Sequence, residues 1–516
     1  MSDHQAEHSN ERAQPAMKTA LLLSYHFPPI ASAGTFRSLR LAKYLPEFGW
    51  RPVVVSVDPE HSGDRIDAEL ETQLREGTVV SRPGMLHLER SLTEWFRTPK
   101  KSSAGAVTEG EPVTEKAASS GGTGKSGAGW RLWLRHLRDL LFCTPDRMIG
   151  WVPHAVSQGL RLVRENHVDL IYSTGPPHSA HLAGLLLKRL TGLPWVVDFR
   201  DPWSRQPWRD QLRNPWGYNA GTLLEGECVR RASVVVLNTD RLAASFREYY
   251  TGEPAGKFQV ISNGFDPEMR LTVQELLERS PAPAPEKSIR LLHAGSLYNR
   301  RSLRPFVDVI RTLRAEGLPV SFEQIGHCSD ESGVRAYIRE CGLEEHVLIR
   351  APVPHRQALE ASAAADVLVL IQPGNRLQVP GKLFEMMLFG KPVLALADDG
   401  AASDLVQQHR LGMVVGSDDP LEMVSAVRRL VMSLRDRSSE IAGPTGISAY
   451  DGQKLVRRMA SLFNRSCGIA DSPGVGEDQG HEPAGGDEGD RRFESATGDS
   501  RRGVDGAVVA GLCRAV

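Results

Sequence analysis

The sequence predicts an α/β protein made of two Rossmann-like, doubly wound domains that face each other across a cleft. Short aliphatic segments alternate with segments of helical periodicity along most of the 516 residues, a pattern typical of parallel sheets covered by helices on both faces. A chain of this length also needs more than one hydrophobic core. A proline-rich segment at 282–287 interrupts the alternation and is interpreted as the hinge between the two domains.

The first domain is predicted to span residues 18–270, after a polar leader at 1–17 that we expect to be disordered. A strand, a helix that begins at a glycine and a second aliphatic strand form its opening βαβ unit. Residues 98–129 contain too few large apolar side chains to offset the entropy of ordering, so we interpret them as a flexible insertion. Strands are predicted at 19–25, 51–57, 168–174, 194–199, 233–239 and 257–263, and helices at 34–50, 130–142, 154–165, before 191, at 216–231 and at 240–250.

The second domain is predicted to span residues 286–440, where the same alternation starts again. A C-terminal helix at 441–466 follows, and then a tail at 467–516 that is rich in glycine and acidic residues and that we expect to be disordered. Strands are predicted at 289–295, 320–326, 347–350, 366–371 and 392–397, and helices at 302–316, 332–341, 355–363 and 382–389.

Composition and charge exclude several classes of function. A formal net charge of −1 gives no general electrostatic attraction for nucleic acid. The six cysteines are scattered, and no two have the C-x₂-C spacing of a zinc or redox site, which predicts a reducing cytoplasm and no bound metal. The polar N-terminus is no secretory signal, and no apolar run approaches the roughly 20 residues of a membrane-spanning helix. We therefore expect a cytoplasmic protein whose contact with the inner face of the membrane is at most peripheral.

Two facing doubly wound domains bind ligands at the carboxyl ends of their strands, so the loops that follow strands hold the candidate residues. After the first strand, Gly34 would let backbone N–H groups approach an anion, and Arg37 adds a guanidinium one turn later. The alternative is a turn glycine and a solvated arginine. Arg200 and Asp201 directly follow an apolar strand, which favours a position in the cleft over a local ion pair that caps the sheet.

A second group of candidates follows the first strand of the second domain. Gly295 and Ser296 stand at the end of that strand, and Arg300, Arg301 and Arg304 surround the predicted helix start. Positive side chains at a helix N-terminus suit a diphosphate, because the helix dipole adds to their charge. The alternative is a basic surface turn.

Residues 379–396 (VPGKLFEMMLFGKPVLAL) combine an apolar helix with two charges in its first turn. Helix 382–389 is apolar on every side, so we expect it to be packed on several sides. One interpretation is local: Glu385 is favourable near a helix N-terminus and pairs with Lys382 at i,i+3. In the other interpretation the helix start faces the cleft, where Lys382 meets a phosphate and Glu385 accepts hydrogen bonds from a ribose diol.

Together these segments resemble the retaining glycosyltransferases of family 4, which have the GT-B fold. The similarity is greatest to the branch that assembles bacterial exopolysaccharide, O-antigen and capsule. It covers about residues 18–465 without the 98–129 insertion. The motifs that carry it are, in order, YHFPP, G-x-x-R, LAKYL, VVDFRDPW, VISNGFD, HAGSLY and PGKLFEMMLFGKPVLAL.

The resemblance implies roles for individual residues. Glu385 matches the second glutamate of the family's E-x₇-E motif, which binds the ribose hydroxyls of the donor, and Arg301 matches its phosphate-binding lysine. Gly34 matches the glycine loop that faces the donor diphosphate. Arg200 stands where many relatives have an active-site histidine, with Asp201 beside it.

Two positions depart from the family pattern. The first glutamate of E-x₇-E, which contacts the donor sugar in relatives, falls at Leu377, and the arginine of the family's G-R-L motif falls at Ser296. The branch that this sequence resembles often has P-x-K-x-x-E instead, so Lys382 is expected to replace a lost phosphate contact.

The resemblance implies a hexosyl-type glycosyltransferase that moves a sugar from a nucleotide-sugar donor to a saccharide or lipid-linked saccharide acceptor, with retention, in cell-surface polysaccharide biosynthesis. Cationic groups would stabilise the leaving nucleoside diphosphate, so no metal and no cofactor are expected. One alternative is a catalytically silent GT-B protein that binds a sugar nucleotide or scaffolds a complex. Another is a sugar-nucleotide epimerase, which the match of the PGKLFE region disfavours. Arg200 and Asp201 are assigned to catalysis, and donor binding is assigned to Gly34, Arg37, Gly295, Ser296, Arg301, Lys382 and Glu385.

The predicted helix at 130–142 (WRLWLRHLRDLLF) is strongly amphipathic, with arginines on one face and tryptophans and leucines on another. This pattern is typical of an interfacial helix on anionic lipid, and equally of a helix packed on the domain core. A lipid-linked acceptor favours peripheral contact with an anionic membrane. No nucleic-acid partner is expected. The arginines concerned are Arg131, Arg135 and Arg138.

Overall fold

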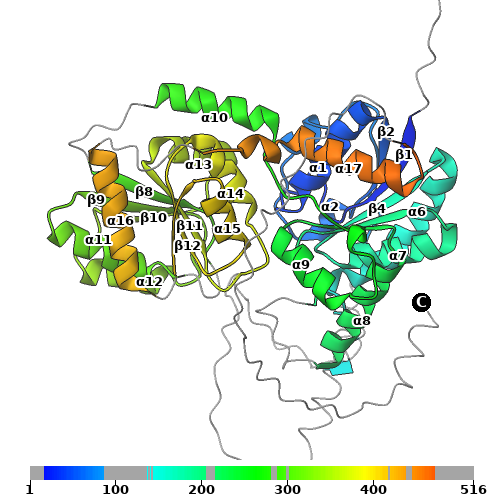
Figure 1. Ribbon diagram of the computed structural model, residues 1–516, viewed down its shortest axis with the longest axis horizontal. Coiled ribbons are helices and arrows are strands. Elements are labelled where there is room, and N and C mark those ends of the chain that lie inside the picture. Colours follow the sequence, from blue (N-terminus) through cyan, green and yellow to red (C-terminus); the bar gives the residue numbers. More distant parts are fainter. Residues whose placement is uncertain are drawn as a thin grey trace, which may run out of the picture.

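The computed structural model describes residues 17–86, 136–137, 140, 143–204, 215–280, 288–297, 302–416, 419–436 and 444–470. It contains two α/β halves, each built around one sheet, which lie side by side (Figure 1). Within the described residues, no helix is long and apolar enough to cross a membrane. Outside the described residues fall the predicted leader except Met17, the 98–129 insertion, the 282–287 hinge, most of the 130–142 helix and nearly all of the tail.

The first half has a seven-stranded sheet in the order β3-β2-β1-β4-β5-β6-β7, and every neighbouring pair is parallel. Its central strands are buried along their whole length because they consist of aliphatic runs that are covered on both faces. The strands are β1 (Lys18–Leu23), β2 (Trp50–Val55), β3 (Val79–Ser81), β4 (Leu170–Gly175), β5 (Trp195–Phe199), β6 (Val234–Leu237) and β7 (Phe258–Val260).

Two layers of helices cover this sheet, one on each face. Helices α6, α7, α8 and α9 contribute to the core on one face, and α1 and α17 to the core on the other. The helices of this half are α1 (Thr35–Tyr44), α2 (Pro59–Ser62), α3 (Glu69–Thr72), α6 (Val152–Asn166), α7 (Ser179–Thr191), α8 (Pro215–Arg231) and α9 (Asp240–Tyr249).

The second half repeats the design with a six-stranded parallel sheet in the order β10-β9-β8-β11-β12-β13. Helices α11, α12 and α16 pack on one face, and α10, α13, α14 and α15 on the other. The strands are β8 (Ile289–Ala294), β9 (Val320–Ile325), β10 (Val347–Arg350), β11 (Val367–Gln372), β12 (Val393–Ala397) and β13 (Gly412–Val415). The helices are α10 (Pro267–Arg279), α11 (Arg304–Ala315), α12 (Glu331–Glu340), α13 (His355–Ala364), α14 (Gly381–Met386), α15 (Ala401–Gln408) and α16 (Pro420–Arg435).

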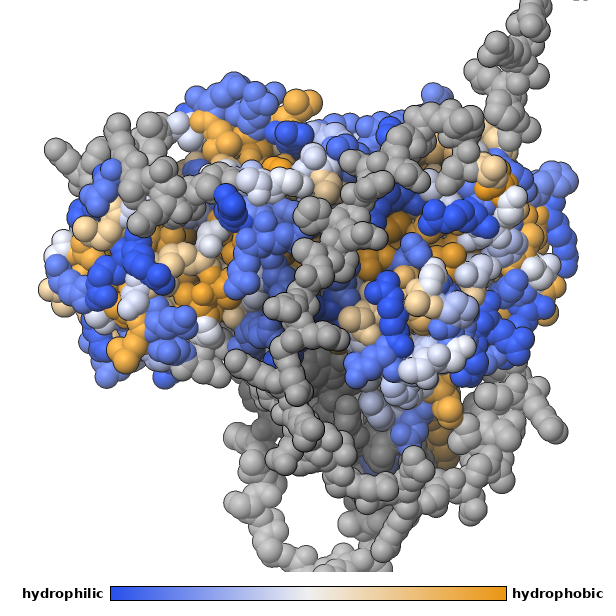
Figure 2. Space-filling model, viewed as in Figure 1, coloured by the Kyte–Doolittle hydropathy of each residue, from blue (hydrophilic) through white to orange (hydrophobic). Residues whose placement is uncertain are grey.

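The two halves share helices across the chain order. Helix α10 directly follows the first sheet in sequence, yet Val273 and Leu276 belong to the core of the second half. Helix α17 (Gly452–Ser466) comes last, yet Leu455 and Phe463 pack on the first sheet beside α1. The chain therefore crosses between the halves twice. Figure 2 shows a mostly hydrophilic face with apolar residues between polar ones, as expected for helices whose apolar sides face the sheets.

The predicted fold class, two doubly wound α/β domains, is confirmed. The predicted domain bounds stay a prediction, because the hinge lies outside the described residues. Helix α14 is shorter than predicted: it ends at Met386 and continues as a single 3₁₀ turn at Met387–Phe389.

Candidate functional site

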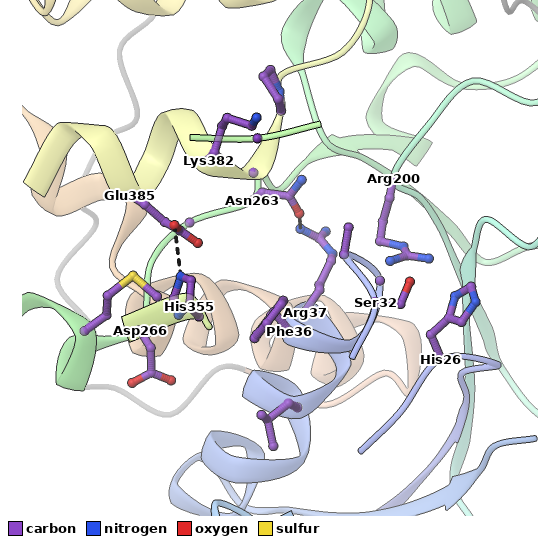
Figure 3. A pocket seen from close by; sticks show the side chains of 18 of the residues that line it. His26, Ser32, Phe36, Arg37, Arg200, Asn263, Asp266, His355, Lys382 and Glu385 are labelled. Carbon is purple, nitrogen blue, oxygen red and sulfur yellow. Dashed lines mark hydrogen bonds and ion pairs between the residues drawn. The ribbon is translucent and has the colours of Figure 1, made fainter. Parts of the chain in front are cut away.

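A cleft of about 2110 Å³ lies between the two halves and takes its lining from loops that follow strands in both sheets. Ligand pockets typically measure about 300–1,000 Å³, so this cleft has room for two substrates side by side. Figure 3 shows side chains entering it from both halves. Eight of the nine predicted site residues line it: Gly34, Arg37, Arg200, Asp201, Gly295, Ser296, Lys382 and Glu385.

The ninth predicted residue, Arg301, lies outside the described residues. Its neighbour Arg304 is described and is not among the residues that line the cleft. Its guanidinium lies 3.8 Å from the Asp330 carboxylate and over the ring of Tyr337. The three predicted arginines around the start of α11 are therefore not a single group of cleft cations, because Arg304 contacts Asp330 and Tyr337 instead.

Lys382 and Glu385 enter the cleft from the first turns of α14, whose other side chains are buried in the second half. Lys382 Nζ donates to the carbonyl oxygen of Ala294 at 3.1 Å, at the end of β8. The next residue is Gly295, where a Cβ would overlap Lys382 Nζ and displace the tip of the lysine. The lysine charge is therefore held directly over the backbone of the first loop of the second half.

Glu385 has a partner that the sequence did not indicate. Its Oε2 lies 3.2 Å from Nε2 of His355, the first residue of α13. This hydrogen bond raises the pKa of His355, against the effect of burial. Phe36 of the first half is 40% exposed, and its ring lies 6.5 Å from the His355 ring across the cleft. Figure 3 shows the three side chains together, so Glu385 belongs to a contact between the two walls.

Gly34 and Arg200 fit against each other in the first half. The Arg200 guanidinium is buried, its Nε donates to the carbonyl oxygen of Gly175 at 3.3 Å, and its Nη2 donates to that of Pro176. A Cβ on Gly34 would overlap this guanidinium. From the sequence, Gly34 was interpreted as a place where an anion could approach the backbone closely. In the structure, the group that lies closest to Gly34 is the Arg200 guanidinium. Burial lowers the pKa of Arg200, which neighbouring Asp201 opposes.

Arg37 is held by several partners within the first half. Its guanidinium is buried and forms a two-point ion pair with Asp198, with Nε–Oδ2 at 2.7 Å and Nη2–Oδ1 at 2.9 Å. The same guanidinium donates to the carbonyl oxygens of Ile261 (2.9 Å) and Ser262 (2.8 Å) and lies 3.5 Å from Oδ1 of Asn263. These contacts use all three of its nitrogens, so Arg37 joins α1, β5 and the chain after β7, and its assignment to donor binding stays a prediction.

Asp201 lies at the boundary between the halves. Burial raises its pKa, while the Arg200 charge and a hydrogen bond from the Gln378 side chain oppose the rise. Gln378 comes from the loop between β11 and α14, and its Oε1 accepts from Nδ2 of Asn375 in the same loop. Both amide side chains line the cleft and are buried. Asp201 is thus the point where the first half meets the loop that precedes Lys382.

His26 also lines the cleft, next to Ser32 and Arg200 (Figure 3). Burial, and then the Arg200 charge, lower its pKa to about 3. Its Nε2 lies 3.1 Å from Oδ2 of Asp64. Since the imidazole is neutral at that pKa, we interpret this contact as a hydrogen bond from Nε2–H to the carboxylate rather than as an ion pair.

Leu377, at the place of the family's first motif glutamate, turns toward the opposite half. Its side chain packs against the core of the first half, and its carbonyl oxygen accepts a hydrogen bond from Thr239 Oγ1 at 2.7 Å. Ser296, the other departure from the family pattern, is exposed at the cleft. An apolar residue at 377 therefore has a packing role that a carboxylate would not fill.

Sequence reasoning missed Asp198, His355, Gln378 and His26. One signal for Asp198 was available: a carboxylate in the middle of the aliphatic run WVVDF needs a buried partner. The others had no local signal, because their partners lie far away in the chain. Among the described residues, no group of three His, Cys, Asp or Glu side chains is placed to hold a metal ion.

The chain matches two family models. Residues 110–264 match the glycosyl transferase 4-like domain, and residues 288–433 match glycosyl transferases group 1. Both halves of the chain are glycosyltransferase domains. No curated protein sequence matches the chain.

Solved structures place the two glycosyltransferase domains in the GT-B fold. Sucrose-phosphate synthase from Thermosynechococcus elongatus has a TM-score of 0.52 and 14% identity, over 87% of this chain and 98% of that chain. Anabaena HepE in complex with UDP-glucose has a TM-score of 0.51 and 15% identity, over 87% and 100%. A glycosyltransferase from Rickettsia africae has a TM-score of 0.51 and 12% identity, over 87% and 98%. At these identities the similarity shows the fold alone.

Proposed function

We propose that the chain transfers a hexose-type sugar from a nucleotide-sugar donor to a saccharide or lipid-linked saccharide acceptor, with retention and without a divalent metal, in cell-surface polysaccharide biosynthesis. One observation carries the proposal: the two charges of otherwise apolar α14, Lys382 and Glu385, both line the cleft between two glycosyltransferase domains. We assign Lys382 to the donor phosphates and Glu385 to the ribose diol. Anabaena HepE has this fold and was solved with UDP-glucose, which makes UDP-sugars the first donors to test.

The chemistry follows from the charges on the two walls. As the bond between the sugar and the diphosphate breaks, negative charge grows on the departing phosphate oxygen. Arg200 from the first half and Lys382 from the second both line the cleft, and cations in a partly buried site stabilise such charge strongly. Asp201, next to Arg200, is assigned to holding that guanidinium charged and in place. The remaining space in the cleft would hold the acceptor.

A thermal-shift screen of UDP-, GDP-, ADP- and dTDP-sugars tests donor binding, because a ligand that binds the folded state raises its melting temperature. The variant Glu385→Ala should bind the stabilising nucleotide about tenfold more weakly, a loss of about 1.4 kcal/mol. Glu360→Ala is the matched control, because Glu360 is an exposed carboxylate on α13 that pairs with Arg356. The donor assignment is wrong if no nucleotide sugar raises the melting temperature or if Glu385→Ala binds like the wild type.

Transfer itself is tested by release of nucleoside diphosphate in the presence of a membrane lipid extract. Membrane contact is part of the proposal as well, with the protein at the inner face of the membrane. Co-sedimentation with phosphatidylglycerol vesicles, compared for the wild type and a variant with Arg131, Arg135 and Arg138 replaced by glutamate, tests it. Equal sedimentation of the two proteins would refute a role for the 130–142 segment.

A second candidate function is a catalytically silent protein that binds a sugar nucleotide. The placement of Leu377 favours it, because the residue at the family's sugar-binding position packs on the first half instead. The same two assays separate the candidates. Tight nucleotide-sugar binding without release of nucleoside diphosphate, across donors and lipid extracts, would favour the silent protein.

A further inference from the structure

The loop between β11 and α14 is held by the first half at two of its residues. Leu377 packs its side chain on the core of the first half and accepts the hydrogen bond from Thr239. Gln378, the next residue, donates to the Asp201 side chain. This loop belongs to the second half and leads directly into Lys382 and Glu385. Its position therefore depends on how the two halves lie against each other.

Thr239 has two tasks at once. Its Oγ1 accepts from the backbone N–H of Leu242 at 3.1 Å, which caps the N-terminus of α9, and the same hydroxyl donates to Leu377 across the boundary. Because the cap fixes the hydroxyl, its proton points to the carbonyl of the loop. The contact is therefore directed and does not result from a mobile surface side chain.

Arg241, two residues later in the first turn of α9, makes a second connection. Its guanidinium donates to Asp404 (Nε–Oδ2 2.5 Å, Nη2–Oδ1 2.7 Å) and to Asp399 (Nη1–Oδ2 3.0 Å, Nη2–Oδ1 2.6 Å). Both carboxylates lie at the start of α15 in the second half. Asp399 also meets the loop, because its carbonyl oxygen accepts from Nε of Arg376 at 3.2 Å.

We propose that these contacts form a clasp between the halves that positions the donor loop, residues 373–380, over the sugar-nucleotide site. The clasp consists of Thr239 and Arg241 in the first half and of Leu377, Asp399 and Asp404 in the second. The inference rests on the proposed function, since it assumes that the donor lies beside this loop. It gives the loop of this chain a support from the opposite domain at the position where family members have a sugar-binding carboxylate.

The clasp is able to open. The side chains of Arg241, Asp399 and Asp404 are 31%, 66% and 46% exposed, and ion pairs at such exposure are individually weak and sensitive to salt. Leu377 is only partly buried. Breaking the clasp releases the loop without unfolding either core. The residues of the clasp are positioning residues: they act on the donor through the loop that they hold.

The test compares Arg241→Ala with Arg230→Ala. Arg230 is the matched control because it is also exposed, yet it pairs with Glu227 inside α8 at 3.0 Å. Dissociation constants for UDP and UDP-glucose are measured by calorimetry. The loop contacts the sugar part in this proposal, so Arg241→Ala should weaken UDP-glucose binding about tenfold and UDP binding less than twofold, the size expected for two exposed ion pairs. Arg241→Lys should cause an intermediate loss of UDP-glucose affinity, because lysine keeps the positive charge but loses the planar guanidinium that binds two carboxylates at once.

A second readout requires no ligand. Hydrogen exchange of peptides that cover residues 373–380 should become about tenfold faster in Arg241→Ala and stay unchanged in Arg230→Ala, while exchange in β11 is the same in all proteins. Thr239→Ser keeps the hydroxyl and should behave like the wild type. Unchanged exchange of the loop in Arg241→Ala overturns the clasp.

The two readouts separate failure of the clasp from failure of the proposed function. If the wild type binds neither UDP nor UDP-glucose and no other nucleotide sugar, the proposed function fails, and the exchange of the loop still decides whether the clasp exists. If Arg241→Ala weakens UDP and UDP-glucose equally, the nucleotide site stands, but the clasp does not position the sugar part, and the inference is overturned.

Discussion

Replacing Arg37 by alanine separates the sequence-based role of this residue from its role in the structure. As a donor ligand, Arg37 would be lost with little effect on stability. In the structure its loss leaves the Asp198 carboxylate, which is 0% exposed, with the hydroxyl donors of Tyr172 and Thr174. Removing one partner of a buried ion pair costs about 3–5 kcal/mol, because the remaining charge stays buried without its counterion. We expect the first domain to lose that much unfolding free energy.

Tryptophan fluorescence during urea unfolding measures this loss in the first domain alone. All nine tryptophans of the chain lie between Trp50 and Trp216, so their signal reports this domain and not the second. With a slope of about 3 kcal/mol per M urea, the midpoint should fall by about 1–2 M. Arg51→Ala is the control: Arg51 is exposed, bonds the carbonyl oxygen of Asn166 at 3.2 Å, and its loss should cost no more than about 0.5 kcal/mol.

Unchanged stability together with weaker nucleotide-sugar binding would refute the structural role of Arg37. If Arg37→Ala unfolds at the urea midpoint of the wild type and binds nucleotide sugar at least about tenfold more weakly, then Arg37 contacts the nucleotide sugar directly. The contacts with Asp198 would in that case give way to a phosphate when the donor binds. A variant that is destabilised but, while still folded, binds nucleotide with the affinity of the wild type would confirm the structural role.

Two further predictions concern the second domain. Gly295→Ala places a methyl group where Lys382 Nζ lies, so nucleotide affinity, measured by calorimetry, should fall about tenfold. Gly381→Ala is the control: its Cβ has open space, so affinity should change less than about twofold. Equal effects of the two variants would contradict the proposal that Gly295 leaves room for Lys382. The hydrogen bond with Glu385 raises the pKa of His355 above 6.5, so the stability from this contact is fully present below pH 6.5 and is lost as the pH rises through the folded-state pKa. Under the proposed assignment of Glu385 to the ribose diol, ribose and His355 compete for this carboxylate. Nucleotide affinity should therefore rise over that same pH range, and His355→Ala should remove the rise.

The fold could be predicted well from the sequence because its strands are continuous aliphatic runs, which is what burial on both faces of a parallel sheet requires. The sheet on which each helix packs could not be predicted from the sequence. Helices α10 and α17 each have an apolar face, but the periodicity of a helix states which side is buried and not which sheet buries it. Only the structure shows that α10 belongs to the second core and α17 to the first.

The candidate site could likewise be predicted only where a residue has a local signal in the sequence. Lys382 and Glu385 stand out locally, because a charged side chain in an otherwise apolar helix needs water, a ligand or an opposite charge at its tip. The partner of Glu385 does not stand out, since His355 lies 30 residues away on another helix. Arg37 and Asp198 are 161 residues apart, and the sequence therefore showed an arginine near a helix start without the carboxylate that holds it.

The two glycines assigned to donor binding each leave room for a cation that lines the cleft. From the sequence, Gly34 was interpreted as a place where backbone N–H groups approach an anion, and Gly295 was assigned to donor binding at the end of a strand. In the structure each lies against a cation from another segment: Arg200, after β5, lies against Gly34, and Lys382 of α14 lies against Gly295. A Cβ at either position would overlap that cation. Two of the cations that line the cleft are therefore seated on glycines of opposite walls. Since one cation belongs to each domain, a donor diphosphate bound between them, as proposed, would attract both domains, and donor binding would then be coupled to the approach of the two halves.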